Sequence, residues 1–129
     1  MMKTELIIRI AALFGVLAVI FGAFGAHALE NMLVETGRLD TYETAVSYHF
    51  YHTLALLAVA LLGRLYPENS RLFTSAWFFI AGILIFSGSL YTLCLSDVSW
   101  LGAITPIGGL AFILGWMILL VSFGKRNPS

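Results

Sequence analysis

Four stretches of this chain carry no Asp, Glu, Lys or Arg, and each is about as long as a lipid bilayer is thick. They cover residues 10–29, 44–63, 72–96 and 98–124. A helix that rises about 1.5 Å per residue needs about 20 residues to cross roughly 30 Å of hydrocarbon. Because apolar and polar residues do not alternate within the stretches, helices are favoured over barrel strands. The sequence predicts an all-α membrane protein, a bundle of four transmembrane helices.

Composition supports lipid as the solvent. Of the 129 residues, 60% are hydrophobic and 11% are charged, whereas soluble domains carry about 25% charged residues. A soluble domain of this length cannot bury so much apolar surface. We therefore expect one transmembrane domain over residues 1–129, with spans at about 7–29, 42–65, 71–95 and 104–123.

Turn and capping signals mark the breaks between spans. Thr36-Gly37 is predicted to close the first helical stretch, and Asp40 with Glu43 has the spacing of a capping box for the second. Residues 67–70 form a tight turn before the third span. Thr105-Pro106 predicts an N-cap followed by proline at the first helical position. A longer, kinked helix that begins near Trp100 is the alternative.

The basic residues predict the orientation. The four predicted spans place one basic residue, Arg38, on one side of the membrane. The other six lie on the opposite side: Lys3, Arg9, Arg64, Arg71, Lys125 and Arg126. Basic residues concentrate on the cytoplasmic side, so both termini are expected to be cytoplasmic. A cleaved signal peptide ending at Ala26-His27-Ala28 is a competing interpretation, but the first apolar run is longer than the usual 7–15 residues of such peptides.

Charge and cysteine content exclude other classes. Seven basic and seven acidic residues give zero net charge, so no basic field indicates a nucleic-acid partner. The single cysteine, Cys94, cannot form an intramolecular disulfide and lies in an apolar run, as a small buried side chain would. The partners expected from the sequence are membrane lipid and other membrane proteins or a second copy of the chain.

Small residues recur at helical spacing and predict helix contacts. In the first span they follow steps of three and four, which places them on one face, and small residues let helices approach closely in lipid. We expect the following residues to pack helices: Gly15, Ala18, Gly22, Gly25, Gly82, Gly88, Gly108 and Gly109.

The polar residues of the spans are predicted to share the outer leaflet. His49 and His52 lie on one helix face at a spacing of three. Polar side chains at membrane depth turn away from lipid, where they would lack hydrogen-bond partners. A single cluster at the outer end of the bundle is therefore expected, with candidate ligand-binding residues His27, His49, His52, Ser87, Ser89, Tyr91 and Thr105.

Four motifs, in order along nearly the whole chain, resemble one family. They are Gly22-Ala23-Phe24-Gly25-Ala26-His27, Thr44-Ala45-Val46-Ser47-Tyr48-His49 followed by His52, Phe86-Ser87-Gly88-Ser89-Leu90-Tyr91 and Ile104-Thr105-Pro106-Ile107-Gly108-Gly109. The chain resembles the YgdD/YwdK-like small membrane proteins, also called domain of unknown function 423 or transmembrane protein 256-like. The resemblance implies a multi-span protein of the bacterial inner membrane, with mitochondrial relatives and no assigned activity. Family members often carry a glutamine-like residue at the position of His49, which argues against an obligatory ligand there.

Three functional interpretations remain open. The preferred one is a structural or accessory protein whose polar side chains hold the helices together. The second is a binding module for a small lipophilic molecule such as a quinone, or for haem or a metal, since imidazole binds such groups. The third is an oligomeric transporter or channel. No enzyme is expected, because neither Ser87 nor Ser89 lies in a nucleophile elbow and no carboxylate is placed to orient a histidine.

Overall fold

The computed structural model describes residues 2–124 and is helical along the four predicted spans. Helix α1 covers Met2–Ala26, α3 covers Leu39–Leu65 and α6 covers Thr105–Ser122. The third span is continuous through α4 (Ser70–Gly82), a π-helical segment η1 (Ile83–Ser87) and α5 (Gly88–Ser96). All four are long and apolar enough to cross a membrane. The predicted four-helix membrane bundle is confirmed.

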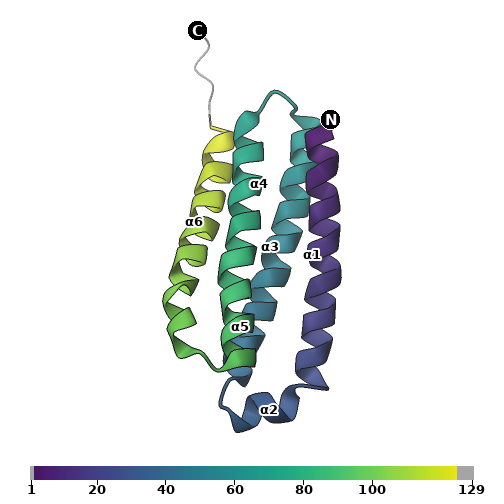
Figure 1. The fold of residues 1–129 in the computed structure, drawn as a ribbon. Coiled ribbons are helices and arrows are strands. Elements are labelled where there is room, and N and C mark those ends of the chain that lie inside the picture. The colour runs from purple at the N-terminus through teal and green to yellow at the C-terminus, as the bar shows by residue number, and fades with distance from the viewer. Residues whose placement is uncertain (1, 125–129) are drawn as a thin grey trace.

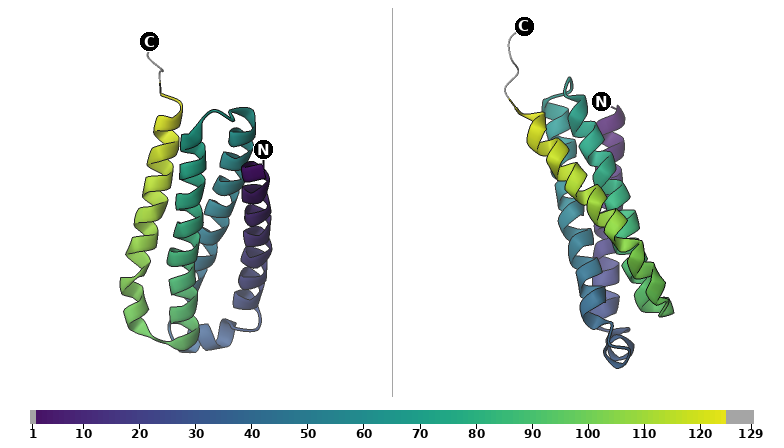
Figure 2. Two further views of the ribbon diagram at one scale, coloured as in Figure 1. Left: turned by 45° about the horizontal axis from the view of Figure 1, so that its top comes forward. Right: turned by 90° about the vertical axis from the view of Figure 1, so that its left-hand side faces the viewer.

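The helices pack in the order of the sequence, and the bundle is open on one side. Helix α1 packs along α3, α3 packs on α4, and α4 packs along α6. Figure 1 accordingly shows α1 and α6 at opposite edges of the bundle. Within residues 2–124, α1 has no comparable packing against α4, α5 or α6. The α1 edge is thus held to the bundle mainly through α3, with single side-chain contacts to α4 and α5 such as Phe21 on Tyr91. Two further views show the same arrangement of the helices (Figure 2).

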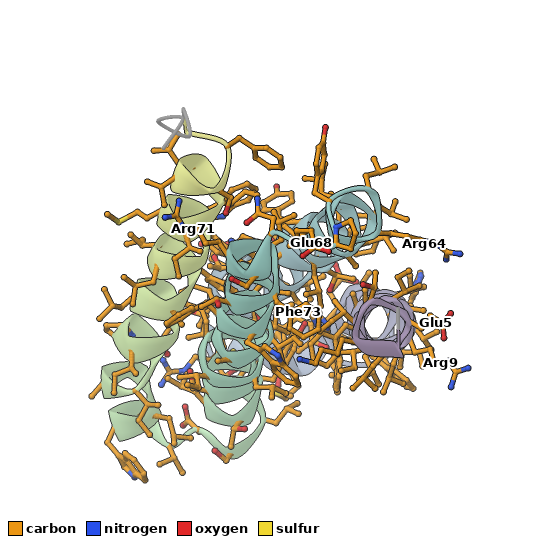
Figure 3. The ribbon with its side chains drawn as sticks, turned by 90° about the horizontal axis from the view of Figure 1, so that it is seen from above. Glu5, Arg9, Arg64, Glu68, Arg71 and Phe73 are labelled. Carbon is orange, nitrogen blue, oxygen red and sulfur yellow. The ribbon has the colours of Figure 1, made fainter. Side chains whose placement is uncertain are left out.

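Both ends of the described chain lie at one end of the bundle, the terminal end, where α1 begins and α6 ends (Figure 1). Seen along the bundle from this end, the charged side chains Glu5, Arg9, Arg64, Glu68 and Arg71 surround the helix ends (Figure 3). Arg38 lies at the opposite end, beside the short helix α2 (Glu30–Glu35). Lys125 and Arg126, on which the predicted orientation also rests, lie outside the described residues.

The first loop differs from the prediction. Helix α1 ends at Ala26, three residues before the expected boundary at Leu29, because the chain turns there into α2. Gly37 has φ +68°, a left-handed conformation that favours glycine, and it ends α2. The predicted capping box is wrong: Arg38 is the N-cap of α3 and makes no side-chain capping bond. Asp40 therefore lies inside the first turn, where its negative charge still favours the helix N-terminus.

The start of α6 combines the two predicted alternatives. A 3-10 turn, η2 (Ser99–Ala103), precedes the helix, and Ile104 is the N-cap. Thr105 was expected to be the N-cap and is the first helical residue instead. Its hydroxyl lies 2.7 Å from that of Ser89 on α5, so it links two helices and is not free to cap one.

Most of the predicted small residues lie at helix contacts. Ala18 is buried, and a side chain at Gly15, Gly22 or Gly25 would meet Thr53, Val46 or Tyr42 of α3. On the other side, Gly82 lies under the Phe112 ring, Gly108 lies against the Phe86 backbone, and Gly109 lies beside the Phe86 ring. Gly88 is the exception, because a Cβ there would meet nothing within 4 Å. The prediction that Gly88 packs a helix is wrong: η1 turns it towards the open side of the bundle.

Candidate functional site

A groove of about 490 Å³ opens on the side of the bundle between α1 and the η1–α5 part of the third span. We call it the lateral groove. Helix α1 contributes Phe14, Leu17 and Phe21, α3 contributes His49, and the facing wall is drawn from residues 83–96. Ligand pockets commonly measure about 300–1,000 Å³ and are mostly apolar with few polar groups. The groove has the size and lining of such a pocket.

The lateral groove faces the region where lipid would lie. Leu84 and Leu95 on its wall are 59% and 51% exposed, and both belong to a membrane-spanning stretch. Apolar side chains that are exposed within a span contact lipid tails. A lipophilic molecule would therefore enter the groove from the bilayer.

His49 is the buried polar residue at the α3 side of this groove. Its Nδ1 lies 2.9 Å from the hydroxyl of Tyr91, across the groove on α5. Its Nε2 has no hydrogen-bond partner within the described chain, although the ring lies near the backbone of Phe14. The Thr53 hydroxyl, one turn further along α3, is likewise buried without a partner. Two buried polar groups on this side of α3 therefore have no hydrogen-bond partner among the described residues.

Aromatic rings fix the position of Tyr91. The Tyr91 ring stacks on Phe21 of α1 with centroids 4.5 Å apart, and Tyr42 tilts against it at 5.5 Å. Tyr42 is in turn held by donating a 2.6 Å hydrogen bond to the Phe21 carbonyl. Since aromatic pairs in such geometries add stability beyond burial, Tyr91 is held in register with His49.

The π-helical segment η1 places Ser87 at the same wall. Ser87 is buried and donates a 2.8 Å hydrogen bond to the Ala45 carbonyl of α3. A π segment inserts an extra residue into a helix turn, and such segments occur frequently at functional sites. Here the segment turns Ser87 towards α3 and leaves Gly88 at the groove.

His52 belongs to a different environment. It faces α4 and α6, where its ring stacks on Phe112 with centroids 3.6 Å apart. Trp116 donates its indole N–H to His52 Nε2 at 3.1 Å, so the ring is neutral there and its Nδ1–H donates to the Tyr48 carbonyl at 2.8 Å. Both ring nitrogens are thus satisfied, and His52 holds α3 to α6.

The predicted single polar cluster is wrong, because the candidate residues form separate groups. His49 pairs with Tyr91, Ser89 pairs with Thr105, and His27 is exposed at the end of α1. Residues three apart on a helix differ by about 60° around its axis. This angle is enough to direct His49 and His52 to different neighbouring helices. Whether any of these residues binds a ligand stays a prediction.

The structure also bears on the metal alternative. Within residues 2–124, no three His, Cys, Asp or Glu side chains come close enough together to hold a metal ion. A metal site made jointly by His49 and His52 is not supported either, since both nitrogens of His52 are engaged by Tyr48 and Trp116.

Two side chains that shape these environments were not selected from the sequence. Tyr42 positions Tyr91, and Trp116 satisfies His52. Tyr42 lies seven residues before His49, a spacing that keeps both on one helix face. This spacing could have predicted from the sequence that Tyr42 lies on the same side of α3 as His49. Trp116 lies 64 residues from His52, and no local pattern connects the two.

Comparisons with known proteins agree with this architecture. The family model described as "Protein of unknown function (DUF423)" matches residues 21–109. The UPF0382 membrane protein YwdK of Bacillus subtilis is 43% identical over 94% of this chain and 98% of its own length. A UPF0382 membrane protein of Haemophilus influenzae is 42% identical over 87% of this chain and 88% of its own length. No solved structure matches the chain.

Proposed function

The chain belongs to the DUF423 family of membrane proteins, and from this premise we propose that it binds a small lipophilic molecule, taken from the bilayer into the lateral groove. Among the interpretations of the sequence, this is the binding-module alternative. The observation that carries it is a lipid-facing groove of about 490 Å³ with an incompletely hydrogen-bonded histidine, His49, in its lining. A purely structural role for the polar residues accounts well for His52, whose bonds are complete, and poorly for His49.

The role is proposed as binding and not as catalysis. The polar side chains that line the groove are His49, Ser87, Tyr91, Thr92 and Ser96. The hydroxyls of Ser87, Thr92 and Ser96 each donate to a backbone carbonyl, so none of them is an activated nucleophile. In this proposal the protein is an accessory component that holds a lipophile and whose direct partner is membrane lipid.

Filling the groove tests the proposal. Gly88→Leu would place an apolar side chain in the groove, since Gly88 lines it and nothing lies within 4 Å of a Cβ at this position. Ala58→Leu, at an exposed position of α3 outside the groove, is the matched control. Wild-type protein and both variants are purified in mild detergent, and their bound lipophiles are extracted and quantified by mass spectrometry.

We expect a small lipophile enriched over bulk lipid in the wild type and in Ala58→Leu, and strongly depleted in Gly88→Leu. The same lipophile content in all three proteins would contradict the proposal.

We also propose that the membrane is the bacterial inner membrane and that both termini face the cytoplasm. Support comes from the basic residues near the terminal end, where Arg9, Arg64 and Arg71 are seen in Figure 3 and Lys3 lies in the first turn of α1. Among the described residues, the other end has Arg38 alone. A reporter active only outside the cytoplasm should be silent when fused after Ser129 and active when inserted near Gly37. An active fusion after Ser129 would reverse the orientation.

A further inference from the structure

The His49–Tyr91 pair holds one more hydrogen than its own hydrogen bond uses. A neutral imidazole carries one N–H and a phenol carries one O–H. The 2.9 Å contact between Nδ1 and the hydroxyl consumes one of these hydrogens, whichever tautomer is present. The other remains either on His49 Nε2 or on the Tyr91 oxygen. The Phe14 backbone lies near the imidazole but does not meet hydrogen-bond geometry with Nε2, so no hydrogen-bonded acceptor is found within residues 2–124. A buried donor is therefore left over at the groove in both cases.

This spare hydrogen favours a ligand that carries a hydrogen-bond acceptor. A buried donor without an acceptor destabilises the protein, so a ligand that supplies an acceptor gains more than one that does not. Among the described residues that line the groove, none is Asp, Glu, Lys or Arg. Because a charge in such surroundings would lack a counter-ion, the ligand must be uncharged.

Depth excludes the ester carbonyls of ordinary phospholipids. His49 lies five residues, or about 8 Å of helix rise, inside the uncharged stretch 44–63. Phospholipid esters stay near the polar surface of the bilayer because their charged head groups do. The acceptor at His49 must therefore belong to a molecule whose whole head group enters the hydrocarbon.

The walls favour a flat head group. Phe14, Phe21 and Tyr91 all line the groove, and aromatic rings bind other flat rings by offset or edge contacts. Phe14 packs edge-on against the His49 ring, with centroids 6.1 Å apart.

We propose that the lateral groove takes an uncharged lipophile whose flat head group carries a carbonyl, the class to which quinones belong, and that the spare hydrogen of the His49–Tyr91 pair donates to this carbonyl. The inference rests on the proposed function and adds the chemical class of the ligand.

The test compares two probes that differ only in their carbonyl groups. Duroquinone carries two ring carbonyls, and durene is the same methylated ring without them. The chain has three histidines, so protein labelled with nitrogen-15 histidine in detergent gives few imidazole signals, which His27→Gln and His52→Gln assign. Each probe is titrated while its affinity and the imidazole signals are followed by NMR.

We expect duroquinone to shift the signals of His49, to leave those of His27 and His52 unchanged, and to bind more tightly than durene. In the double variant His49→Leu/Tyr91→Phe, which removes the spare hydrogen and keeps apolar groups, duroquinone should bind about tenfold more weakly, as for the loss of one hydrogen bond. Durene should bind the double variant as it binds the wild type.

Equal affinities of the wild type for the two probes, both blocked by Gly88→Leu, would overturn this inference and leave the proposed function standing. If neither probe binds or disturbs His49, the proposed function fails together with the inference.

Discussion

The two faces of α3 carry the same kind of residue in opposite states. On the face towards α4 and α6, His52 is stacked on Phe112 and both of its nitrogens are hydrogen-bonded. On the face towards α1 and α5, His49 lines an open groove and makes one hydrogen bond, and its Nε2 has no partner among the described residues. The first we call the closed face and the second the open face. Both histidines are buried, so burial alone does not distinguish a packing histidine from one available to a ligand.

The cause of the difference lies in the neighbouring helices. On the closed side, α4 and α6 approach closely because three glycines leave room for the neighbouring helix. Gly82 packs against the Phe112 ring, Gly108 against the Phe86 backbone, and Gly115 against the Phe79 ring. On the open side, α1 packs along α3 and meets α5 mainly through the Phe21–Tyr91 stack, and a Cβ at Gly88 would meet no described neighbour within 4 Å. Helix packing in lipid depends on such close contacts. The glycines of the closed side therefore determine where the helices pack tightly against each other.

The largest expected effect is on the closed side. Gly108→Ala would place a methyl group against the backbone nitrogen of Phe86, which cannot rotate away. We expect a loss of about 3 kcal/mol, at the upper end of overpacking costs. Gly88→Ala on the open side should be neutral or stabilising by up to about 1 kcal/mol, since alanine favours helices. Unfolding in detergent, followed by circular dichroism, measures both, and equal stabilities would remove the distinction between the two sides.

A smaller effect should follow when each polar pair is replaced by apolar groups. His52→Leu/Trp116→Phe removes two satisfied hydrogen bonds and the stacked ring, which should cost about 2 kcal/mol at about 1 kcal/mol per bond. His49→Leu/Tyr91→Phe also removes an unpaired donor, so its cost should be close to zero without ligand. The same unfolding assay measures the stability of both double variants. A larger loss of stability for the His49 pair than for the His52 pair would mean that the hydrogen bonds of His49 and Tyr91 are complete in solution.

The smallest effect is expected at the end of the bundle opposite the termini. Arg38, between α2 and α3, donates from Nε and Nη2 to Asp97 at 3.2 and 3.1 Å and so ties the two loops together. Asp97 is largely exposed and has φ +55°, a conformation that asparagine also tolerates. Asp97→Asn should therefore cost less than about 1 kcal/mol, and less still at high salt. A salt-independent loss above this value would show that the pair contributes more than an exposed ion pair.

The sequence was sufficient for the spans and insufficient for the site, for different physical reasons. Long uncharged stretches must enter lipid, so the four helices and most glycine contacts could be predicted. Which helix faces His49 or His52 depends on a rotation of about 60° around α3 and on partners as distant as Trp116. The π segment, which leaves Gly88 at the groove, has no clear signature in residues 83–87. The neighbours of His49, His52 and Gly88 thus depend on how the helices pack, which sequence periodicity does not show.

The bilayer should reach the open face of α3 and not the closed face. An apolar diazirine dissolved in the membrane and activated by light, with insertion sites located by mass spectrometry, measures this directly. We expect insertion at the buried groove residues His49 and Tyr91 as well as at exposed positions, with His52 and Phe112 unlabelled, and loss of the groove labelling in Gly88→Leu. Equal labelling of His49 and His52, or none at Tyr91, would contradict it.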